Sequence, residues 1–383
     1  MVSETHLFII WANARKNSDD ILKHIKKKFE IRDVYEITWD SKDFIRNIKK
    51  FYGVTLPDPE RKIKQSGTGP FLLIIVTDNN PKHEMRKTSL GKQIVNANMY
   101  DSKREYRKIV SGEFPIHGTI NQKEVNHNLS LIIGKNLEQI TNEFKSTWDG
   151  NIKRIKQNVL GLDGWKDFKE LFFVLNNTLD YVVLRNFEGL PEKEINEKFE
   201  DVDILTDDHW QIPYILGKNF PGNKNKKFPW IKINEKYYKF DIKYVGDTYL
   251  DEKWSNDILK RRKLTKNGIY VPSTEDHFYT LIHHIVMQKT KLKVEYKEKL
   301  IILARELHLE NFDKKVGDLD FLKTILEKYI KKNGYRYTDS FVYKIGHNEF
   351  LRLTEVAVKV ARKDGVGELF RATKGKFKRI RKK

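Results

Sequence analysis

Apolar runs of strand length alternate with amphipathic helical stretches through the first third of the chain, and this alternation constrains the fold most. Residues 5–11 and Pro70–Thr77 each contain an unbroken apolar run, Leu7–Trp11 and Phe71–Val76, and such runs are typical of buried strands. Between them, Asp19–Phe29 repeats its apolar residues with the period of a helix, and Val34–Trp39 predicts another strand. Strands and helices interleaved in this order predict an α/β (α+β) fold that begins with a ferredoxin-like sandwich.

The second half of the chain changes from a mixed to a helical pattern. Residues 181–184 and 201–205 predict strands, and residues 230–245 predict a hairpin. From Ser273 onward the apolar spacing is helical. A chain of 383 residues is also too long for one ordinary core. We therefore predict an N-terminal domain at 1–135, a helical connector at 136–164, a second α/β domain at 165–290, a helical subdomain at 291–345 and a basic tail at 346–383.

Composition excludes several classes of site. The chain has no cysteine, which rules out disulfides, thiolate zinc sites and a cysteine nucleophile. Its apolar runs are too short to span a membrane, and its first residues lack the pattern of a signal peptide. These features predict a cytoplasmic protein.

The formal net charge of +20 predicts an anionic partner. Residues 351–383 hold twelve Lys and Arg against three Asp and Glu. Three interpretations of this segment stay open: peripheral contact with an anionic membrane, binding to RNA or DNA phosphates, or a solvated tail.

Two aspartates alternate with aliphatic residues at the start of a predicted strand. Residues two apart on a strand share a face, so Asp201 and Asp203 point the same way while Val202 and Ile204 enter the core. Neighbouring carboxylates repel each other unless a cation lies between them, and hard oxygen ligands suit Mg²⁺ or Mn²⁺. A solvated strand face is the alternative.

A third acid, Asp241, lies in an otherwise apolar and aromatic strand. A buried acid is unfavourable without a partner. The partner is either a metal ion shared with Asp201 and Asp203 or a lysine on the same face, Lys239 or Lys243. Two acids on one strand and a third on a neighbouring strand form a constellation suited to metal-dependent phosphoryl transfer.

Residues 165–290 resemble the nucleotidyltransferase superfamily, in particular small bacterial-type members often found near surface-polysaccharide genes. The strand Val182–Leu184, a following turn, the acid-x-acid pair and the later Asp241 match the family pattern. Arg185 and Asn186 replace the small turn residues of the family. The resemblance implies a nucleotidyltransferase-type palm, Mg²⁺ (or Mn²⁺) held by Asp201, Asp203 and Asp241, and a nucleotide or nucleotide-activated donor.

The same resemblance extends to a helix that follows the palm and suggests further nucleotide contacts. Arg185 and Asn186 are expected to contact phosphates, and Lys289 to reach a triphosphate. A solvated helix end is the alternative for Lys289. His283 and His284 cannot share one helical face, so at most one of them lines the site, His284 in our expectation, and the other packs in the core.

Residues 5–135 resemble a diverged nucleoside diphosphate kinase. In that family the histidine of an Ile-His-Gly-Ser motif accepts the phosphoryl group, which implies His117 as a nucleophile here. Trp11 and Ser111 replace two cationic ligands of the family, so a binding module on the same fold stays open. The matching segments are Phe8–Ile10, Phe51-Tyr52, Gly69-Pro70, Leu90-Gly91, Asp101–Lys103, Gly112–Phe114 and Ile116–Thr119.

These expectations combine into one leading function. It is a metal-dependent nucleotidyl- or phospho-polyol-transferase that modifies a surface glycan, a glycopolymer or a small molecule. The alternatives are a nucleotidyltransferase that modifies RNA or protein, a glycosyltransferase that uses the Asp-x-Asp pair, and a non-catalytic binding scaffold.

Overall fold

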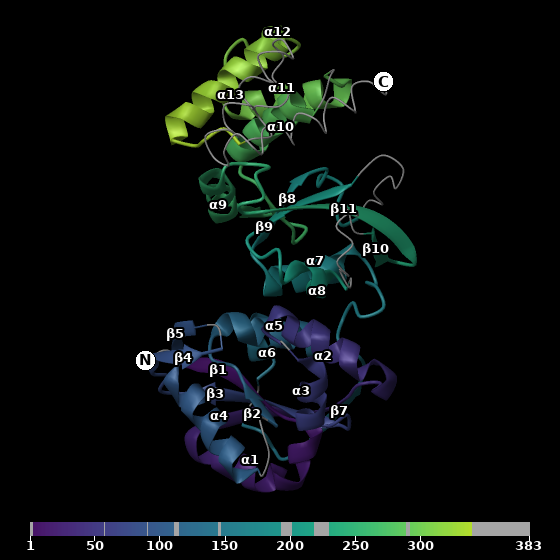
Figure 1. Cartoon of the computed structure of the whole chain (residues 1–383), viewed down its shortest axis with the longest axis vertical. Coiled ribbons are helices and arrows are strands. Elements are labelled where there is room, and N and C mark those ends of the chain that lie inside the picture. The colour runs from purple at the N-terminus through teal and green to yellow at the C-terminus, as the bar shows by residue number, and fades with distance from the viewer. Residues whose placement is uncertain are drawn as a thin grey trace, which may run out of the picture. The chain divides into compact units, whose positions relative to one another are not determined.

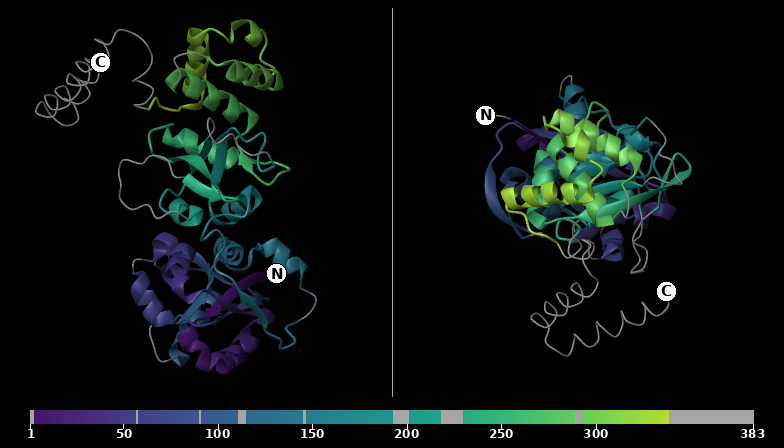
Figure 2. Two further views of the ribbon diagram at one scale, coloured as in Figure 1. Left: turned by 90° about the vertical axis from the view of Figure 1, so that its right-hand side faces the viewer. Right: turned by 90° about the horizontal axis from the view of Figure 1, so that it is seen from above.

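The computed structural model describes residues 3–56, 58–89, 91–110, 115–144, 147–192, 201–217, 230–288 and 292–338. The fold is mixed α/β, with several small sheets (Figures 1 and 2). The chain divides into two compact units. The first comprises Met1–Tyr244 and Arg262–Val271, and the second comprises Val245–Arg261 and Pro272–Lys383. The predicted tail at 346–383 lies outside the described residues.

A five-stranded sheet forms the N-terminal part of the first unit, in the order β6-β1-β3-β2-β7. Adjacent strands are antiparallel except β7, which runs parallel to β2. All eight residues of the central strand β3 are buried. The strands are β1 (Glu4–Ile10), β2 (Glu30–Thr38), β3 (Phe71–Asp78), β6 (Ile116–Gly118) and β7 (Lys153–Lys156).

Helices cover both faces of this sheet because its strands alternate between two cores (Figure 1). Leu7 and Ile9 of β1 pack with residues of α2 and α5, whereas Phe8 and Ile10 pack with residues of α1 and α4. A separate hairpin pairs β4 with β5. These elements are α1 (Ser18–Lys28), α2 (Phe44–Tyr52), α3 (Pro59–Ser66), β4 (His83–Thr88), β5 (Gly91–Asn96), α4 (Ala97–Ile109) and α5 (Gln122–Ile133).

The expectation of a helical connector at 136–164 is wrong for most of the described part of that segment. Helix α6 covers Leu137–Asn142 only, and Lys153–Lys156 forms strand β7. The strand consists of three basic residues and one isoleucine and shows no helical period. Pairing with the open edge of β2 supplies hydrogen bonds that the isolated segment lacks. Tertiary pairing therefore decides the conformation there.

A second, four-stranded sheet lies in the later part of the first unit, in the order β10-β11-β9-β8. Strand β9 is parallel to β11 and antiparallel to β8. The predicted hairpin is present, and Asn234 and Glu235 form its turn with φ of 46° and 62°, as a tight two-residue hairpin requires. The elements are α7 (Phe168–Thr178), β8 (Tyr181–Arg185), β9 (Val202–Thr206), α8 (Ile212–Leu216), β10 (Trp230–Ile233), β11 (Lys236–Tyr244), β12 (Lys263–Leu264) and β13 (Tyr270–Val271).

One hydrophobic core joins the two sheets within the first unit. Leu129 and Ile132 of α5 belong to the same buried cluster as Leu171 and Leu175 of α7. The buried Lys50 strengthens this connection, because its Nζ donates to the carbonyls of Gly161 and Ile215. A single hydrophobic core therefore connects the N-terminal sheet with α7 and the second sheet.

The second unit is helical in its described part. Its helices are α9 (Glu252–Arg261), α10 (Thr274–Gln288), α11 (Val294–Glu306), α12 (Phe312–Lys315) and α13 (Leu319–Asn333). A bidentate ion pair joins Arg261 to the buried Asp276, and Tyr279 stacks on Tyr329 with ring centroids 3.6 Å apart. Among the described residues, every helix is too short or too polar to cross a membrane.

Candidate functional site

The register of the second sheet brings the three predicted aspartates together. Asp203 of β9 and Asp241 of β11 are direct partners on adjacent parallel strands. Asp201 comes two residues before Asp203 and therefore lies on the same face, while Val202 and Ile204 enter the core as predicted. We call Asp201, Asp203 and Asp241 the aspartate site.

Each carboxylate of the aspartate site has a cationic partner. Lys239 Nζ lies 3.2 Å from Asp201 Oδ2, and Lys243 Nζ lies 2.9 Å from Asp241 Oδ1. Arg185 pairs with Asp203. In these side-chain orientations, no group of three or more acidic or histidine side chains in the described part of the chain is arranged to hold a metal ion.

A β-bulge directs Arg185 toward the aspartate site. The pairing of β8 with β9 shifts between Val183 and Arg185, which makes Arg185 the direct partner of Asp203. Without the extra residue, strict alternation would place Arg185 on the core face with Val183. The arginine and Asp203 are 3% and 2% exposed, so this ion pair is removed from water.

The turn after β8 begins with a residue in the left-handed backbone region. Asn186 has a φ of 60°, in the left-handed region where glycine is favoured and asparagine is tolerated. The replacement that the sequence shows at this position is therefore compatible with a tight turn. Its side chain stays partly exposed.

Burial is the main influence on the charge of Asp203. Burial and the nearby carboxylates of Asp201 and Asp241 together raise the pKa of Asp203 to about 6, against the lowering effect of Arg185 and Lys243. The three carboxylates are thus close enough to repel one another. A divalent cation relieves that repulsion, and carboxylate oxygens are the ligands that Mg²⁺ and Mn²⁺ prefer, so the donor set fits such an ion.

His117 lies in strand β6 as the partner of Ile9 in β1. The side chain is buried between the rings of Phe51 and Tyr52. Its Nε2 lies 2.9 Å from the amide nitrogen of Asn128 and 3.6 Å from Glu124 Oε1. If Nε2 carries the ring proton and directs it toward Glu124, Nδ1 is the unprotonated nitrogen of the neutral ring; if Nε2 instead accepts from Asn128, Nδ1 carries the proton.

Three cations surround His117. Lys103 Nζ donates to the Gly118 carbonyl at 3.0 Å, and Arg107 Nε donates to the Ile116 carbonyl at 3.0 Å. Lys62 of α3 is buried, with its Nζ over the rings of Trp11 and Tyr52. We call His117, Lys62, Lys103 and Arg107 the histidine site.

The charges of the histidine site act on one another. Burial, followed by the charges of Lys103, Lys62 and Arg107, holds the pKa of His117 well below its ordinary value, so the ring is neutral. Burial and the charge of Arg107 lower the pKa of Lys62 to about 7. An anion bound among these groups would offset both effects.

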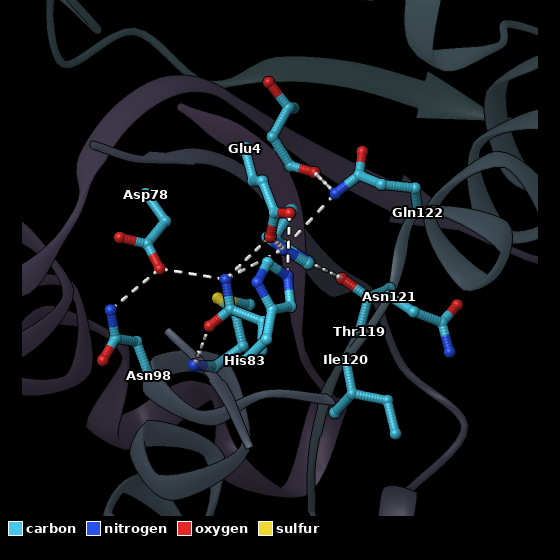
Figure 3. Close-up of polar contacts among 12 residues, drawn as sticks. Glu4, Asp78, His83, Asn98, Thr119, Ile120, Asn121 and Gln122 are labelled. Carbon is cyan, nitrogen blue, oxygen red and sulfur yellow. Dashed lines mark hydrogen bonds and ion pairs between the residues drawn. The ribbon is translucent and has the colours of Figure 1, made fainter. Parts of the chain in front are cut away.

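A polar cluster anchors β6 behind the histidine site (Figure 3). Thr119 Oγ1 lies 3.2 Å from the Nδ1 of the fully buried His6, whose Nε2 lies 3.1 Å from Glu4. Asn96 donates to Glu4 and to Asp78, at 3.0 Å each. The threonine that follows His117-Gly118 is therefore a structural anchor for the strand.

The remaining predicted residues belong to the second unit or lie outside the described residues. His284 is buried on α10 of the second unit, with its Nε2 3.5 Å from the Tyr296 hydroxyl. His283 is buried there against Tyr249 and Trp254. Lys289 lies outside the described residues.

Most cations of the histidine site were not predicted from the sequence. Lys103 was named only within the segment that resembles nucleoside diphosphate kinases, and two cationic ligands of that family were expected to be missing. Lys103 and Arg107 are four residues apart on α4, a spacing that places them on one helical face, and this signal was present in the sequence. The burial of Lys62 depends on tertiary packing and had no local signal.

Comparison of the chain with protein-family models, with curated proteins and with solved structures finds no match in any of the three. Both family resemblances therefore stay predictions, and the function is argued from the geometry of the two sites.

Proposed function

We propose that the protein is a metal-dependent nucleotidyl- or phospho-polyol-transferase whose chemistry takes place at the aspartate site. The observation that carries this proposal is the direct pairing of Asp203 with Asp241 on adjacent parallel strands, with Asp201 on the same face. The strand orders support the finer fold assignments: β6-β1-β3-β2 suits a ferredoxin-like sandwich, and β11-β9-β8 suits a nucleotidyltransferase-type palm.

The residues of the aspartate site would have different roles in the reaction. Asp201 and Asp203 would hold a divalent ion, which supplies charge neutralisation at the transferred phosphoryl group. Asp241 would either complete the ligand set or take the proton from the acceptor hydroxyl. Arg185, with its guanidinium next to Asp203, is suited to hold a phosphate oxygen of the donor.

The sequence favours two classes of acceptor. The resemblance to proteins found near surface-polysaccharide genes favours a glycan, a polyol or another small molecule. The net charge of +20 favours RNA as the alternative. The experiment therefore includes both acceptors.

Transfer is tested by incubating the full chain with Mg²⁺ and each nucleoside triphosphate labelled at the α-phosphate, with glycan, protein or RNA fractions added separately. We expect a labelled product that EDTA abolishes and that Asp203→Asn abolishes. Asp207→Asn, a substitution in the exposed turn just beyond β9, serves as the control and should retain activity. The absence of label with every donor and acceptor, together with no metal-dependent nucleotide binding, would falsify the proposal and favour a scaffold.

A second candidate function is phosphoryl transfer through His117. The specific observation in its favour is the trio of cations around a neutral, buried histidine. Nδ1 would attack the terminal phosphorus of a donor, the bond to the leaving group would break, and the product would be a phosphohistidine. Lys62, Lys103 and Arg107 would stabilise the charge on the transferred group.

This candidate is tested with donors labelled at the terminal phosphate. A phosphohistidine is expected as protein-bound label that is stable to base and labile to acid, and His117→Asn should remove it. Thermal melting of the variant checks that the fold survives. Label retained by folded His117→Asn but lost in Asp203→Asn would assign all chemistry to the aspartate site.

A further inference from the structure

The hairpin of β4 and β5 exposes a face that combines apolar and basic side chains. Its register makes Met85 the direct partner of Ile94, and these two residues are 57% and 65% exposed. Two positions further along, Lys87 is the direct partner of Lys92, and both lysines are exposed. Direct partners lie on one face of a sheet, and so do residues two apart on a strand. We call these four residues the hairpin face; none of them belongs to the aspartate site or the histidine site.

The opposite face of the hairpin is fixed to α4. By alternation Arg86 lies on that face, and it contacts Asp101 of α4 at 3.2 Å. The Tyr100 hydroxyl donates to the Lys87 carbonyl at 2.8 Å, and the side chain of Asn96, at the end of β5, caps α4. Figure 1 shows β4 and β5 close to α4 in the first unit. These contacts hold the hairpin in place and leave the hairpin face exposed.

The charge of the hairpin face is not compensated within the described part of the chain. Lys87 and Lys92 place like charges on directly opposite residues, an arrangement that destabilises a strand pair. Neither lysine forms an ion pair with a described residue. Glu84 is the only acid of the two strands, and it pairs with Arg86 at 2.6 Å on the other face. An anionic partner would therefore relieve the repulsion between the two lysines.

The chemistry of the hairpin face distinguishes among anionic partners. Nucleic acid would satisfy the lysines through its phosphates, but it would leave Met85 and Ile94 without a partner, because bases stack on aromatic rings. A second copy of the chain that met this face by two-fold symmetry would bring its own lysines to the same interface. An anionic lipid surface satisfies both parts of the face, since basic side chains attract its headgroups while apolar side chains enter the boundary of headgroups and acyl chains.

We propose that the hairpin of β4 and β5 docks the protein peripherally on an anionic lipid surface, with its apolar pair at the boundary of headgroups and acyl chains and its lysine pair against anionic headgroups. This role is independent of the chemistry at the aspartate site. It also differs from the expected membrane contact through residues 351–383, because it places the contact on a folded element of the first unit. The small apolar area makes the contact reversible.

The absence of cysteine from the sequence allows a single reporter to be placed on the hairpin face. The full chain with Ile94→Cys is labelled with the environment-sensitive fluorophore NBD and mixed with vesicles of phosphatidylcholine and phosphatidylserine. We expect its emission to shift to the blue and to be quenched by lipids that carry a spin label on the acyl chain. Vesicles of phosphatidylcholine alone should produce neither change. The control is Val294→Cys on α11, an aliphatic position that is 69% exposed, and its label should not respond.

Flotation with the same vesicles tests the charge of the hairpin face. Lys87→Gln combined with Lys92→Gln should lower the affinity on the order of tenfold, because each lysine held near an anionic surface contributes to binding. The matched control combines Lys42→Gln with Lys49→Gln, which removes the same charge from exposed positions at α2, across the N-terminal sheet from α4. The affinity of this control should stay close to that of the wild type. Circular dichroism and thermal melting compare the folding of all variants.

Each other outcome overturns the proposal. Flotation without a response of the label at position 94 would place the membrane contact elsewhere in the chain, and a lack of flotation would exclude such a contact. Equal losses of affinity in the two folded double variants would show attraction by net charge alone. A response of the label to RNA without lipid would assign the hairpin face to nucleic acid, and a response to rising protein concentration alone would assign it to a second copy.

Discussion

Burial and neighbouring charge meet at a single carboxyl group, that of Asp203. The side chain is 2% exposed and has Asp201 and Asp241 nearby. Its partner Arg185 reduces the cost of this arrangement without cancelling it. Functional sites are often the places where titrating groups are kept away from their ordinary pKa values, and Asp203 follows that pattern.

We expect Asp203 to titrate near pH 6 in the metal-free protein, since burial first and the adjacent carboxylates next raise its pKa to about 6. Because the folded-state pKa lies above the unfolded value, the ionised carboxyl disfavours the fold at neutral pH, and this cost is relieved as pH falls through 6. Carboxyl ¹³C resonances followed in EDTA measure the midpoint. A midpoint near pH 4 would contradict the expected environment.

Lys62 of the histidine site should lower the stability of the protein. Burial, followed by the charge of Arg107, lowers its pKa to about 7, so the unfolded chain binds a proton more tightly than the folded one. The free energy of unfolding should then fall as pH drops from 10 toward 6. Lys62→Met is expected to stabilise the fold by on the order of 2 kcal/mol at pH 6 and by less at pH 9.

Urea unfolding at the two pH values measures this effect. Lys64→Met, on the exposed side of the same helix, is the matched control and should change stability little at either pH. Equal effects of both substitutions at pH 6 would show that the Lys62 ammonium is not desolvated. If the histidine site binds a ligand, Lys62 is expected to be kept there although it lowers the stability of the fold.

Among the elements, strand β8 has the most consequence for the site, because its bulge and the turn after it set the direction of Arg185. The backbone of Asn186, at a φ of 60°, ends the strand within one residue of the bulge. Only a few residue types adopt this conformation without strain. The turn is therefore specified by local chemistry even though its sequence differs from the small residues expected there.

Substitutions at Asn186 should rank by their tolerance of positive φ. Asn186→Gly is expected to change the free energy of unfolding by only a few tenths of a kcal/mol, whereas Asn186→Val should lower it by about 1–2 kcal/mol because of strain at the β-branched Cβ. Chemical denaturation of the two variants checks the order. Similar losses in both variants would indicate that the asparagine side chain itself stabilises the turn.

Elements with strong periodicity could be predicted from the sequence, and elements that depend on distant partners could not. The apolar run at Pro70–Thr77 corresponds to the buried strand β3, and Asp203 lies in β9 with Asp201 immediately before that strand. Strand β7 has no pattern of its own and forms because β2 offers an open edge. The bulge that redirects Arg185 likewise depends on pairing between strands, so the sequence identified the acids of the aspartate site but not the full pattern of its counterions.

At the scale of the whole molecule, the two sheets of the first unit share one hydrophobic core. Residues of α5 and α7 belong to a single buried cluster that also includes Leu7 of β1 and Phe240 of β11. Packing of this kind couples the stability of the parts it joins. The part of the first unit that carries the histidine site and the part that carries the aspartate site should therefore unfold together.

Leu175→Ala tests this coupling, because Leu175 on α7 is fully buried in the shared core. The cavity should lower the free energy of unfolding by about 3 kcal/mol. Hydrogen exchange followed by mass spectrometry should then show faster exchange in β3 as well as in β9. Lys169→Ala, on the exposed side of α7, is the control, and faster exchange restricted to β9 would show that the sheets open independently.

The outer strands of the N-terminal sheet come from far along the chain. Strand β6 pairs with β1 at His117 and Ile9, and β7 pairs with β2 at Lys153 and Tyr35. The N-terminus of a chain leaves the ribosome first. Strands β1, β2 and β3 therefore emerge long before β6 and β7, which flank them in the sheet. Contacts so distant in sequence form slowly, and open sheet edges bind other chains readily. We expect the nascent N-terminal half to need protection from association until β7 has left the ribosome.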